Sequence, residues 1–82
     1  MYFLYILKST KFNWTYIGIT ADIEARLKRH NSGQVKSTQF YRPFILMHTE
    51  SYASRNEVSE RELELKNNSY KKRELLISLN LL

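Results

Sequence analysis

Cysteine is absent from this chain of 82 residues, which also has only two glycines and one proline. The lack of cysteine excludes disulfide bonds, thiolate zinc sites and a cysteine nucleophile. It fits a reducing compartment, and we expect a cytoplasmic protein. With 43% hydrophobic residues and few chain breakers, the chain should fold around one hydrophobic core. The length predicts a single domain over residues 1–82.

Long hydrophobic runs are also missing. The N-terminal segment MYFLYILKST is apolar but short, and no basic residue precedes its apolar part. A signal peptide would need a longer apolar core after a basic start. No apolar run approaches the roughly 18 residues of a membrane-spanning helix. We therefore predict no association with a membrane.

Negative charge is the scarcer sign. The chain has 13 Lys and Arg against 8 Asp and Glu, for a net charge of +5. In a small domain this balance favours an anionic partner, of which nucleic acid is the most common. A basic surface without a specific partner is the alternative that charge alone leaves open.

Three segments have the composition of strands. Residues 1–7 and 14–19 are rich in aromatic and branched side chains, and the short polar segment between them predicts an antiparallel hairpin. Residues 44–52 predict a third strand, apolar enough to lie at the centre of the sheet.

Helix signals follow the second and third strands. Thr20 is the predicted N-cap of a helix with Ile23 and Leu27 on its buried side, which residues 31–33 end. The sequence SRNE from Ser54 is a capping box that begins a second helix.

The second helix should end near Asn67, and Ser69 is the predicted N-cap of a third helix. The order strand, strand, helix, strand, helix, helix predicts an α+β domain. Its sheet would be small and mainly antiparallel, with the helices packed on it.

Glu62 does not fit a purely structural interpretation of the second helix. It lies four residues after Val58 and three before Leu65, in the middle of the predicted apolar stripe. A carboxylate there is costly unless it is paired or binds a metal. The alternative is a partly exposed glutamate whose head group reaches water or an arginine.

Arg26 and His30 share one face of the first helix. The arginine guanidinium suits phosphate oxygens, and a histidine transfers protons near neutral pH. The alternative is a solvated helix face on which Asp22 pairs with Arg26. His48, in the third predicted strand, is interpreted as a sheet-surface residue without a role.

Tyr5 and Tyr16 lie in the two strands of the predicted hairpin, so their hydroxyls could converge on one side of the sheet. A tyrosine there usually packs with its polar tip in water, but a phenol also acts as a general base or orients a water molecule. Gly18 follows two residues after Tyr16, and we expect it to let a phosphate approach the backbone. Together with the arginine, histidine and glutamate, these groups suit phosphodiester hydrolysis.

The ordered set of motifs resembles the GIY-YIG nuclease domain, and within it the small single-domain bacterial proteins. The first motif corresponds to FLY at residues 3–5 and the second to YIG at residues 16–18. Arg26 and His30 follow in IEARLKRHNSG, and Glu62 begins the family's Glu-x-x-Leu-Lys pattern. The resemblance covers nearly the whole chain.

This resemblance implies a three-stranded antiparallel sheet flanked by three helices, in the order β-β-α-β-α-α, and metal-dependent DNA cleavage. It makes Tyr5 the candidate general base or water-positioning residue, and Tyr16 a support for the nucleophile or the phosphate. It assigns Arg26 to the phosphate charge and His30 to proton transfer or phosphate contact. Glu62 would hold one divalent ion, Mg²⁺ or Mn²⁺, with several retained waters.

The chain departs from the family pattern at three places. Phe3 and Leu4 replace the glycine and isoleucine of the first motif, and Gln39 stands where related small proteins often have a basic residue. Many members complete the site with an asparagine, and neither Asn67 nor Asn68 can be assigned to that position from the sequence. None of these departures removes the proposed catalytic set.

Two main hypotheses follow. One is a DNA endonuclease acting in repair or recombination, which the catalytic set favours. The other is a catalytically weak DNA-binding module with the same fold; a basic domain that binds another protein is a third. With no separate DNA-binding domain, the chain would rely on a protein partner for targeting or on its own basic residues, which are Lys36, Arg42, Lys71, Lys72 and Arg73.

Overall fold

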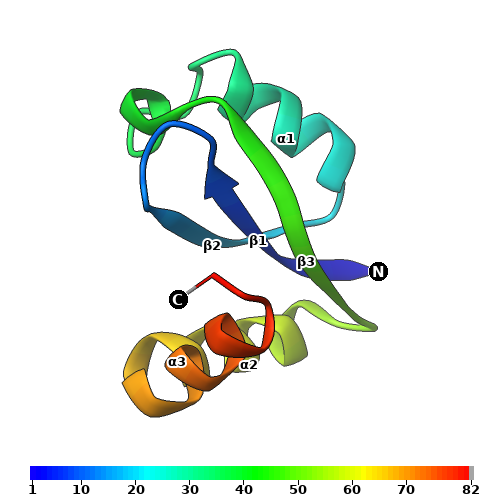
Figure 1. Ribbon diagram of the computed structural model, residues 1–82. Helices are drawn as coiled ribbons and strands as arrows, with labels where there is room; N and C mark the ends of the chain where they lie inside the picture. Colours follow the sequence, from blue (N-terminus) through cyan, green and yellow to red (C-terminus); the bar gives the residue numbers. More distant parts are fainter. Residues whose placement is uncertain (82) are drawn as a thin grey trace.

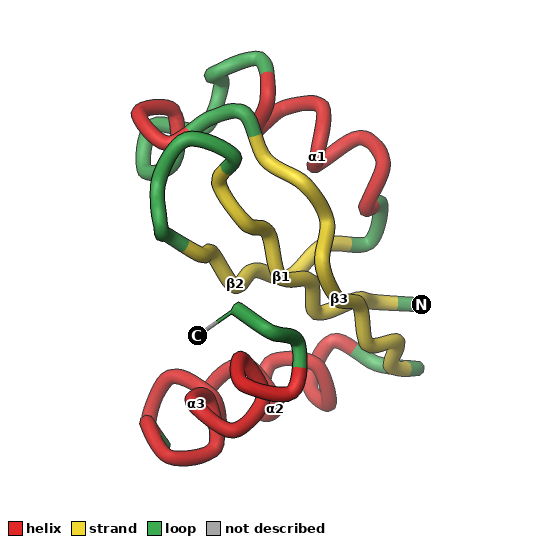
Figure 2. The backbone as a smooth tube through the Cα atoms, viewed as in Figure 1, coloured by secondary structure: helices red, strands yellow, loops and turns green. Residues whose placement is uncertain are grey.

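Three strands and three α-helices follow one another in the predicted order, β-β-α-β-α-α, in the computed structural model, which describes residues 1–81 (Figures 1 and 2). The single-domain prediction also included residue 82, which lies outside the described residues. The elements are β1 (Tyr2–Ser9), β2 (Thr15–Thr20), α1 (Ile23–Asn31), a short 3-10 helix η1 (Gln39–Tyr41), β3 (Phe44–Tyr52), α2 (Arg55–Asn67) and α3 (Ser69–Ser78).

The sheet is antiparallel with strand order β2-β1-β3, so β1 is the central strand. The prediction that residues 44–52 form the central strand is therefore wrong. The reason is that the first strand is buried on both faces through four consecutive residues, 4–7, whereas β3 leaves Ile45 and Leu46 exposed. Tyr5, at the middle of β1, lies opposite Gly18 of β2 and Thr49 of β3.

Alternate residues of β1 face different helices, because side chains of a strand point to opposite faces in turn. Leu4 and Ile6 pack with Val58 and Leu65 of α2 and with residues of α3. Tyr5 and Leu7 lie on the other face, with aromatic side chains and α1. Figure 1 shows α1 on one side of the sheet and the α2–α3 pair on the other. We call these two sides the α1 face and the α2 face.

The helix caps differ from the prediction at two of three positions. Asp22, and not Thr20, caps α1: its carboxylate accepts a hydrogen bond from the Ala25 amide, whereas Thr20 is still in β2. Ser54 caps α2 as predicted. Asn68, and not Ser69, caps α3, because the chain turns so tightly after α2 that one residue serves both helices.

An ionic network joins α2 to β3 on the α2 face. The Glu50 carboxylate accepts hydrogen bonds from Arg61 Nε at 2.8 Å, from His48 Nε2 at 2.9 Å and from the Tyr52 hydroxyl at 2.7 Å. Arg61 in particular lowers the pKa of Glu50 to about 2. His48, expected to have no role, is thus part of a structural cluster.

Within residues 1–81, none of the helices combines the length and the apolar character needed to cross a membrane.

Candidate active site

The Tyr5 hydroxyl is the centre of a polar cluster on the α1 face. It lies 2.9 Å from Nε2 of His30 and accepts a hydrogen bond from Nε of Arg26 at 3.4 Å. The Tyr5 side chain is only 2% exposed, so these partners replace water. β1 and α1 thus bring three of the predicted site residues into direct contact, although Tyr5 lies 21 and 25 residues before its two partners.

Gly18 makes room for the Tyr5 ring. A Cβ atom on Gly18 would lie 2.5 Å from the Tyr5 hydroxyl oxygen and 2.9 Å from a ring carbon of Tyr16. Such contacts are too close for any side chain. The Tyr5 ring thus lies against this backbone, and the approach of a phosphate near Gly18 stays a prediction. Gly18 forms the floor beneath Tyr5.

Helix α1 supplies Arg26 and His30 from successive turns, as their spacing predicted. The alternative of an Asp22–Arg26 pair on a solvated face is not what the structure shows, because Asp22 caps the helix and Arg26 reaches Tyr5. His30 is 0% exposed, although we placed it on a polar face. Its burial follows from the aromatic rings of Tyr16 and Phe44, whose centroids lie 5.1 and 5.9 Å from that of His30.

Burial lowers the pKa of His30 to about 4, and the positive charges of Arg26 and Arg29 add to the effect. His30 is therefore neutral at neutral pH. Its second nitrogen, Nδ1, lies 2.8 Å from Oγ1 of Thr38. We did not anticipate Thr38: it lies in an irregular loop, where sequence spacing does not indicate which side chain turns inward.

Burial is also the main cause that raises the pKa of Tyr5, against the lowering effect of the Arg26 hydrogen bond. Tyr5 is thus protonated at neutral pH. The same hydrogen bond raises the pKa of Arg26, and Tyr16 contributes to that increase. The guanidinium accordingly keeps its charge while lying close to both phenols.

Tyr16 lies beside the cluster on β2. Its ring centroid is 6.2 Å from that of Tyr5 and 6.2 Å from that of Trp14, with which it stacks. Because the Tyr16 side chain is only half-buried, it forms the border between the buried hydroxyl of Tyr5 and solvent. The two tyrosines do converge on one face, as predicted.

Glu62 occupies the predicted position on α2, between the buried side chains of Val58 and Leu65. Its side chain is 21% exposed and lies 3.4 Å from Nζ of Lys66. The Glu62 charge contributes to raising the pKa of Tyr5, so the carboxylate acts electrostatically on the α1 cluster although it belongs to α2. No hydrogen bond joins Glu62 to that cluster among the residues described.

A divalent ion fits Glu62 as a single-carboxylate ligand. In residues 1–81 no three His, Asp or Glu side chains form a ligand group, so the protein offers no complete cage. Mg²⁺ does not require one, because it commonly keeps several waters and binds one or two carboxylates plus phosphate oxygens of a substrate. The partial exposure of Glu62 leaves its carboxylate accessible for that role.

The five basic residues expected to bind nucleic acid fall into two groups on opposite sides of the sheet (Figure 1). Lys36 and Arg42 lie in the loop beside α1, where Arg42 donates to the Gln39 carbonyl. The others lie on α3, where Lys71 pairs with Glu64 at 3.4 Å. The structure does not join the two groups into one surface.

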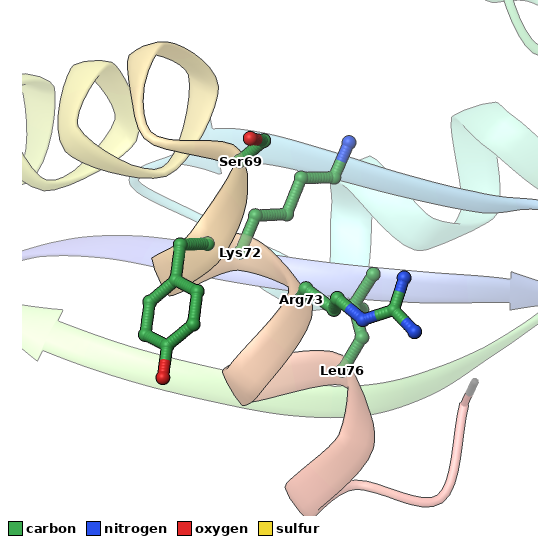
Figure 3. A pocket seen from close by; sticks show the side chains of 5 residues that line it. Ser69, Lys72, Arg73 and Leu76 are labelled. Atoms are coloured by element: carbon green, nitrogen blue, oxygen red, sulfur yellow. The ribbon is translucent and has the colours of Figure 1, made fainter.

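Lys72 and Arg73 border a shallow groove on α3. Figure 3 shows the charged ends of Lys72 and Arg73 extending to the same side of the helix. The groove also includes Ser69 and Leu76. It is separate from the Tyr5 cluster, because none of the residues that line it belongs to that cluster.

Comparison with known proteins agrees with this arrangement. A family model described as the GIY-YIG catalytic domain matches residues 1–74. The chain belongs to the GIY-YIG family. This superfamily consists of nucleases that generally use divalent metals. The match includes the strands, the helix α1 and the whole of α2, and hence all residues of the candidate site.

Two small bacterial relatives show the same relationship. UPF0213 protein BH0048 of Halalkalibacterium halodurans is 38% identical over 79 residues, which are 95% of this chain and 83% of that protein. UPF0213 protein YazA of Bacillus subtilis is 36% identical over 77 residues, 93% of this chain and 77% of that protein.

The fold has a solved counterpart. The solution NMR structure of UPF0213 protein BH0048 superimposes with a TM-score of 0.57 at 37% identity, covering 96% of this chain and 85% of that chain. The three-stranded antiparallel sheet with three helices, predicted from the resemblance to GIY-YIG nucleases, is thereby confirmed.

Proposed function

We propose that this GIY-YIG protein is a divalent-metal-dependent endonuclease that hydrolyses phosphodiester bonds in DNA. The main support is the position of the Tyr5 hydroxyl, held between the guanidinium of Arg26 and the Nε2 atom of a neutral histidine. This arrangement brings together a hydroxyl that can exchange protons, a base that can accept one and a cation suited to phosphate.

In the proposed reaction, a water molecule attacks the phosphorus and passes its proton to the oxygen of Tyr5. The tyrosine proton moves at the same time to Nε2 of His30, over the 2.9 Å hydrogen bond. The P–O bond to the leaving alcohol breaks, and solvent protonates that oxygen. Because the pKa of Tyr5 is raised and that of His30 lowered, the resting enzyme holds its proton on Tyr5, where the reaction needs it.

Arg26 has two functions in this scheme. Its Nε covers the Tyr5 hydroxyl in the absence of substrate. When the guanidinium turns to the phosphate, it stabilises the charge that develops there and exposes the second lone pair of Tyr5 to water. Tyr16 lies at the border with solvent, where its hydroxyl supports the water or a phosphate oxygen.

Glu62 would hold the metal, Mg²⁺ or Mn²⁺, which supplies Lewis-acid activation of the phosphate. Lys36 and Arg42 would contact the DNA backbone near the site, and Lys72 and Arg73 would contact a more distant part. A nuclease of this kind fits DNA repair or recombination in the cytoplasm, with a protein partner for targeting.

Cleavage of a panel of linear, nicked, flapped and branched DNA with Mg²⁺ or Mn²⁺ tests the proposal. We expect cleavage by the wild type, loss of it with a chelator and its return when metal is added back. Glu62→Gln should reduce cleavage by about 1,000-fold or more, on the scale of lost charge stabilisation, while DNA binding is kept. Tyr5→Phe should have a similar effect because it removes the hydroxyl from the relay.

Glu60→Gln is the matched control, since Glu60 is an exposed residue of the same helix and should tolerate the change. Equal activity of the wild type and Glu62→Gln would reject this assignment of the active site. Salt-sensitive DNA binding without cleavage of any substrate would instead support the binding-module alternative.

A further inference from the structure

Thr38 is a buried residue in the loop between α1 and β3. Its side chain is 0% exposed, and its Oγ1 lies 2.8 Å from Nδ1 of His30. It therefore touches the side of the imidazole that faces away from Tyr5. No motif predicted this contact, and the proposed reaction above does not use it.

The loop around Thr38 is firmly held. The Thr38 carbonyl accepts the Tyr41 amide at 2.9 Å, and the Tyr41 carbonyl accepts the Ser9 hydroxyl at 2.6 Å. The Tyr41 ring stacks on Trp14, with centroids 3.9 Å apart and an angle of 11° between the planes. The Thr38 hydroxyl is thus fixed in place by contacts with β1 and with Trp14, the residue that precedes β2.

The hydrogen bonds around His30 are all satisfied by one tautomer. The Thr38 hydroxyl donates to the Val35 carbonyl at 3.4 Å, which leaves its oxygen to accept from Nδ1–H of His30. Nε2 then has a free lone pair, which accepts the Tyr5 O–H. Tyr5 in turn accepts from Arg26. Every donor in this chain has an acceptor.

The other tautomer fits less well. With its proton on Nε2, His30 would donate to the Tyr5 oxygen, which already accepts from Arg26. The Tyr5 O–H would then need a different acceptor, and no other hydrogen-bond partner of that hydroxyl exists in the described part of the chain. A buried hydroxyl without an acceptor costs about 1–3 kcal/mol.

We propose that Thr38 is a positioning residue that keeps the His30 proton on Nδ1, so that Nε2 is free to receive the proton of Tyr5. The catalytic consequence rests on the proposed nuclease function, whereas the tautomer does not. During the reaction Nδ1 keeps its proton, which is hydrogen-bonded to Thr38, while Nε2 gains the proton of Tyr5. The imidazolium then gives the Nε2 proton back to the tyrosine oxygen, which releases to solvent the proton that it took from water.

Nitrogen NMR of the His30 ring tests the assignment directly, because the two tautomers differ in which ring nitrogen carries hydrogen. Proton–nitrogen correlation spectra of isotope-labelled wild type should show the proton on Nδ1. Thr38→Val keeps the shape of the side chain but removes the acceptor of Nδ1–H, and should raise the share of the tautomer with its proton on Nε2. Thr38→Ser keeps a hydroxyl and should preserve the Nδ1 proton.

The rate of DNA cleavage should depend on which tautomer of His30 is present. We expect Thr38→Val to lower kcat by about 100-fold with little change in KM, the scale of a lost proton transfer, and Thr38→Ser to restore most of the rate. Thr49→Val is the matched control, since Thr49 is an exposed threonine opposite Tyr5 on β3.

A wild-type spectrum with the proton on Nε2 would overturn the proposal even if Thr38→Val failed to fold. Full activity of Thr38→Val with the proton still on Nδ1 would also overturn it. If the wild type cleaves no DNA but shows the Nδ1 proton, which moves in Thr38→Val, the positioning role stands and the nuclease proposal fails.

Discussion

The two faces of the sheet satisfy their buried and partly buried polar groups in different ways. On the α2 face the groups are ions: Glu50 and Arg61 lie against each other, and each pKa moves away from neutrality, lowered for the carboxyl and raised for the guanidinium. On the α1 face Tyr5, His30 and Thr38 form a chain of neutral groups, with Arg26 at its end. The ionised groups keep their protonation states near neutral pH, whereas a chain of neutral hydrogen-bonded groups can pass a proton along.

The two networks therefore differ in role: one stabilises the fold and the other supplies the groups for the proposed chemistry. The Glu50–Arg61 network joins α2 to the edge strand, next to the aliphatic core. The Tyr5–His30 chain crosses from the central strand to α1 and ends at a fixed loop. Substitutions in the Glu50–Arg61 network should therefore change stability alone, whereas substitutions in the Tyr5–His30 chain should also change cleavage.

Gly18→Ala on the α1 face should change both cleavage and stability. The new methyl group would meet the Tyr5 hydroxyl at 2.5 Å and displace it. We expect cleavage to fall by about 100-fold, as for a displaced catalytic group, and the free energy of unfolding to fall by about 2 kcal/mol. Cleavage assays and urea unfolding measure the two quantities.

Gly33→Ala is the control for this substitution. Gly33 has φ +82°, and its Cβ would meet only the flexible end of Arg42, at 2.9 Å. It should lose about 1 kcal/mol of stability through backbone strain and keep its cleavage rate. Equal cleavage by the two variants would contradict the role of Gly18 as the floor beneath Tyr5.

The pH dependence of stability distinguishes the faces by their titration ranges. The pKa of His30 falls from 6.5 to about 4 on folding, so its contribution is complete above 6.5 and is lost as the pH falls toward 4. The loss should reach about 3 kcal/mol. The pKa of Glu50 falls from 4.5 to about 2 on folding, so its contribution to stability is lost only as the pH falls below 4.5.

Urea unfolding at a series of pH values measures this dependence. His30→Gln should flatten the curve between 6.5 and 4, and Glu50→Gln should leave that part unchanged. A wild-type stability that is constant over this range would show that the histidine is not held neutral by the fold.

Arg61→Met tests the ionic network on the α2 face. It leaves Glu50 partly buried without its main partner, and we expect a loss of about 2 kcal/mol, the scale of hydrogen bonds to a charged group. The cleavage rate per folded molecule should not change. A variant that folds fully but no longer cleaves would disprove the separation of the two faces.

Asn31→Ala should have the smallest effect. The Asn31 amide accepts from the Phe44 backbone N–H at 2.6 Å and donates to its carbonyl, which joins the end of α1 to the start of β3. Its loss should cost about 1 kcal/mol in thermal or urea unfolding. Asn56→Ala, at an exposed helical asparagine, is the control. A cost no greater than that of the control would mean that water replaces the amide.

Local patterns in the sequence predicted much of this molecule. The third strand, Phe44–Tyr52, was predicted with its observed ends, and Glu62 lies on the buried side of α2 as its spacing required. Arg26 and His30 also lie on one side of α1. Each of these depends on residues a few positions apart, whose relation a regular helix or strand fixes.

Apart from the two helix caps, the errors concern contacts between distant segments. The choice of β1 as the central strand depends on which faces the helices cover, and the burial of His30 depends on Phe44 and Tyr16. Thr38 joins the site only because its loop folds back on the hairpin. An irregular loop has no periodicity like that of a helix or a strand, so residue spacing does not indicate which of its side chains turns inward.

The junction between α2 and α3 consists of Asn68 alone. Its backbone N–H closes α2 on the Glu64 carbonyl at 3.0 Å, and its side chain caps α3 through the Lys71 amide at 3.1 Å. One inserted residue would separate these two duties and turn α3 by about 100° relative to the core, given 3.6 residues per turn. Chain length is therefore fixed at this junction.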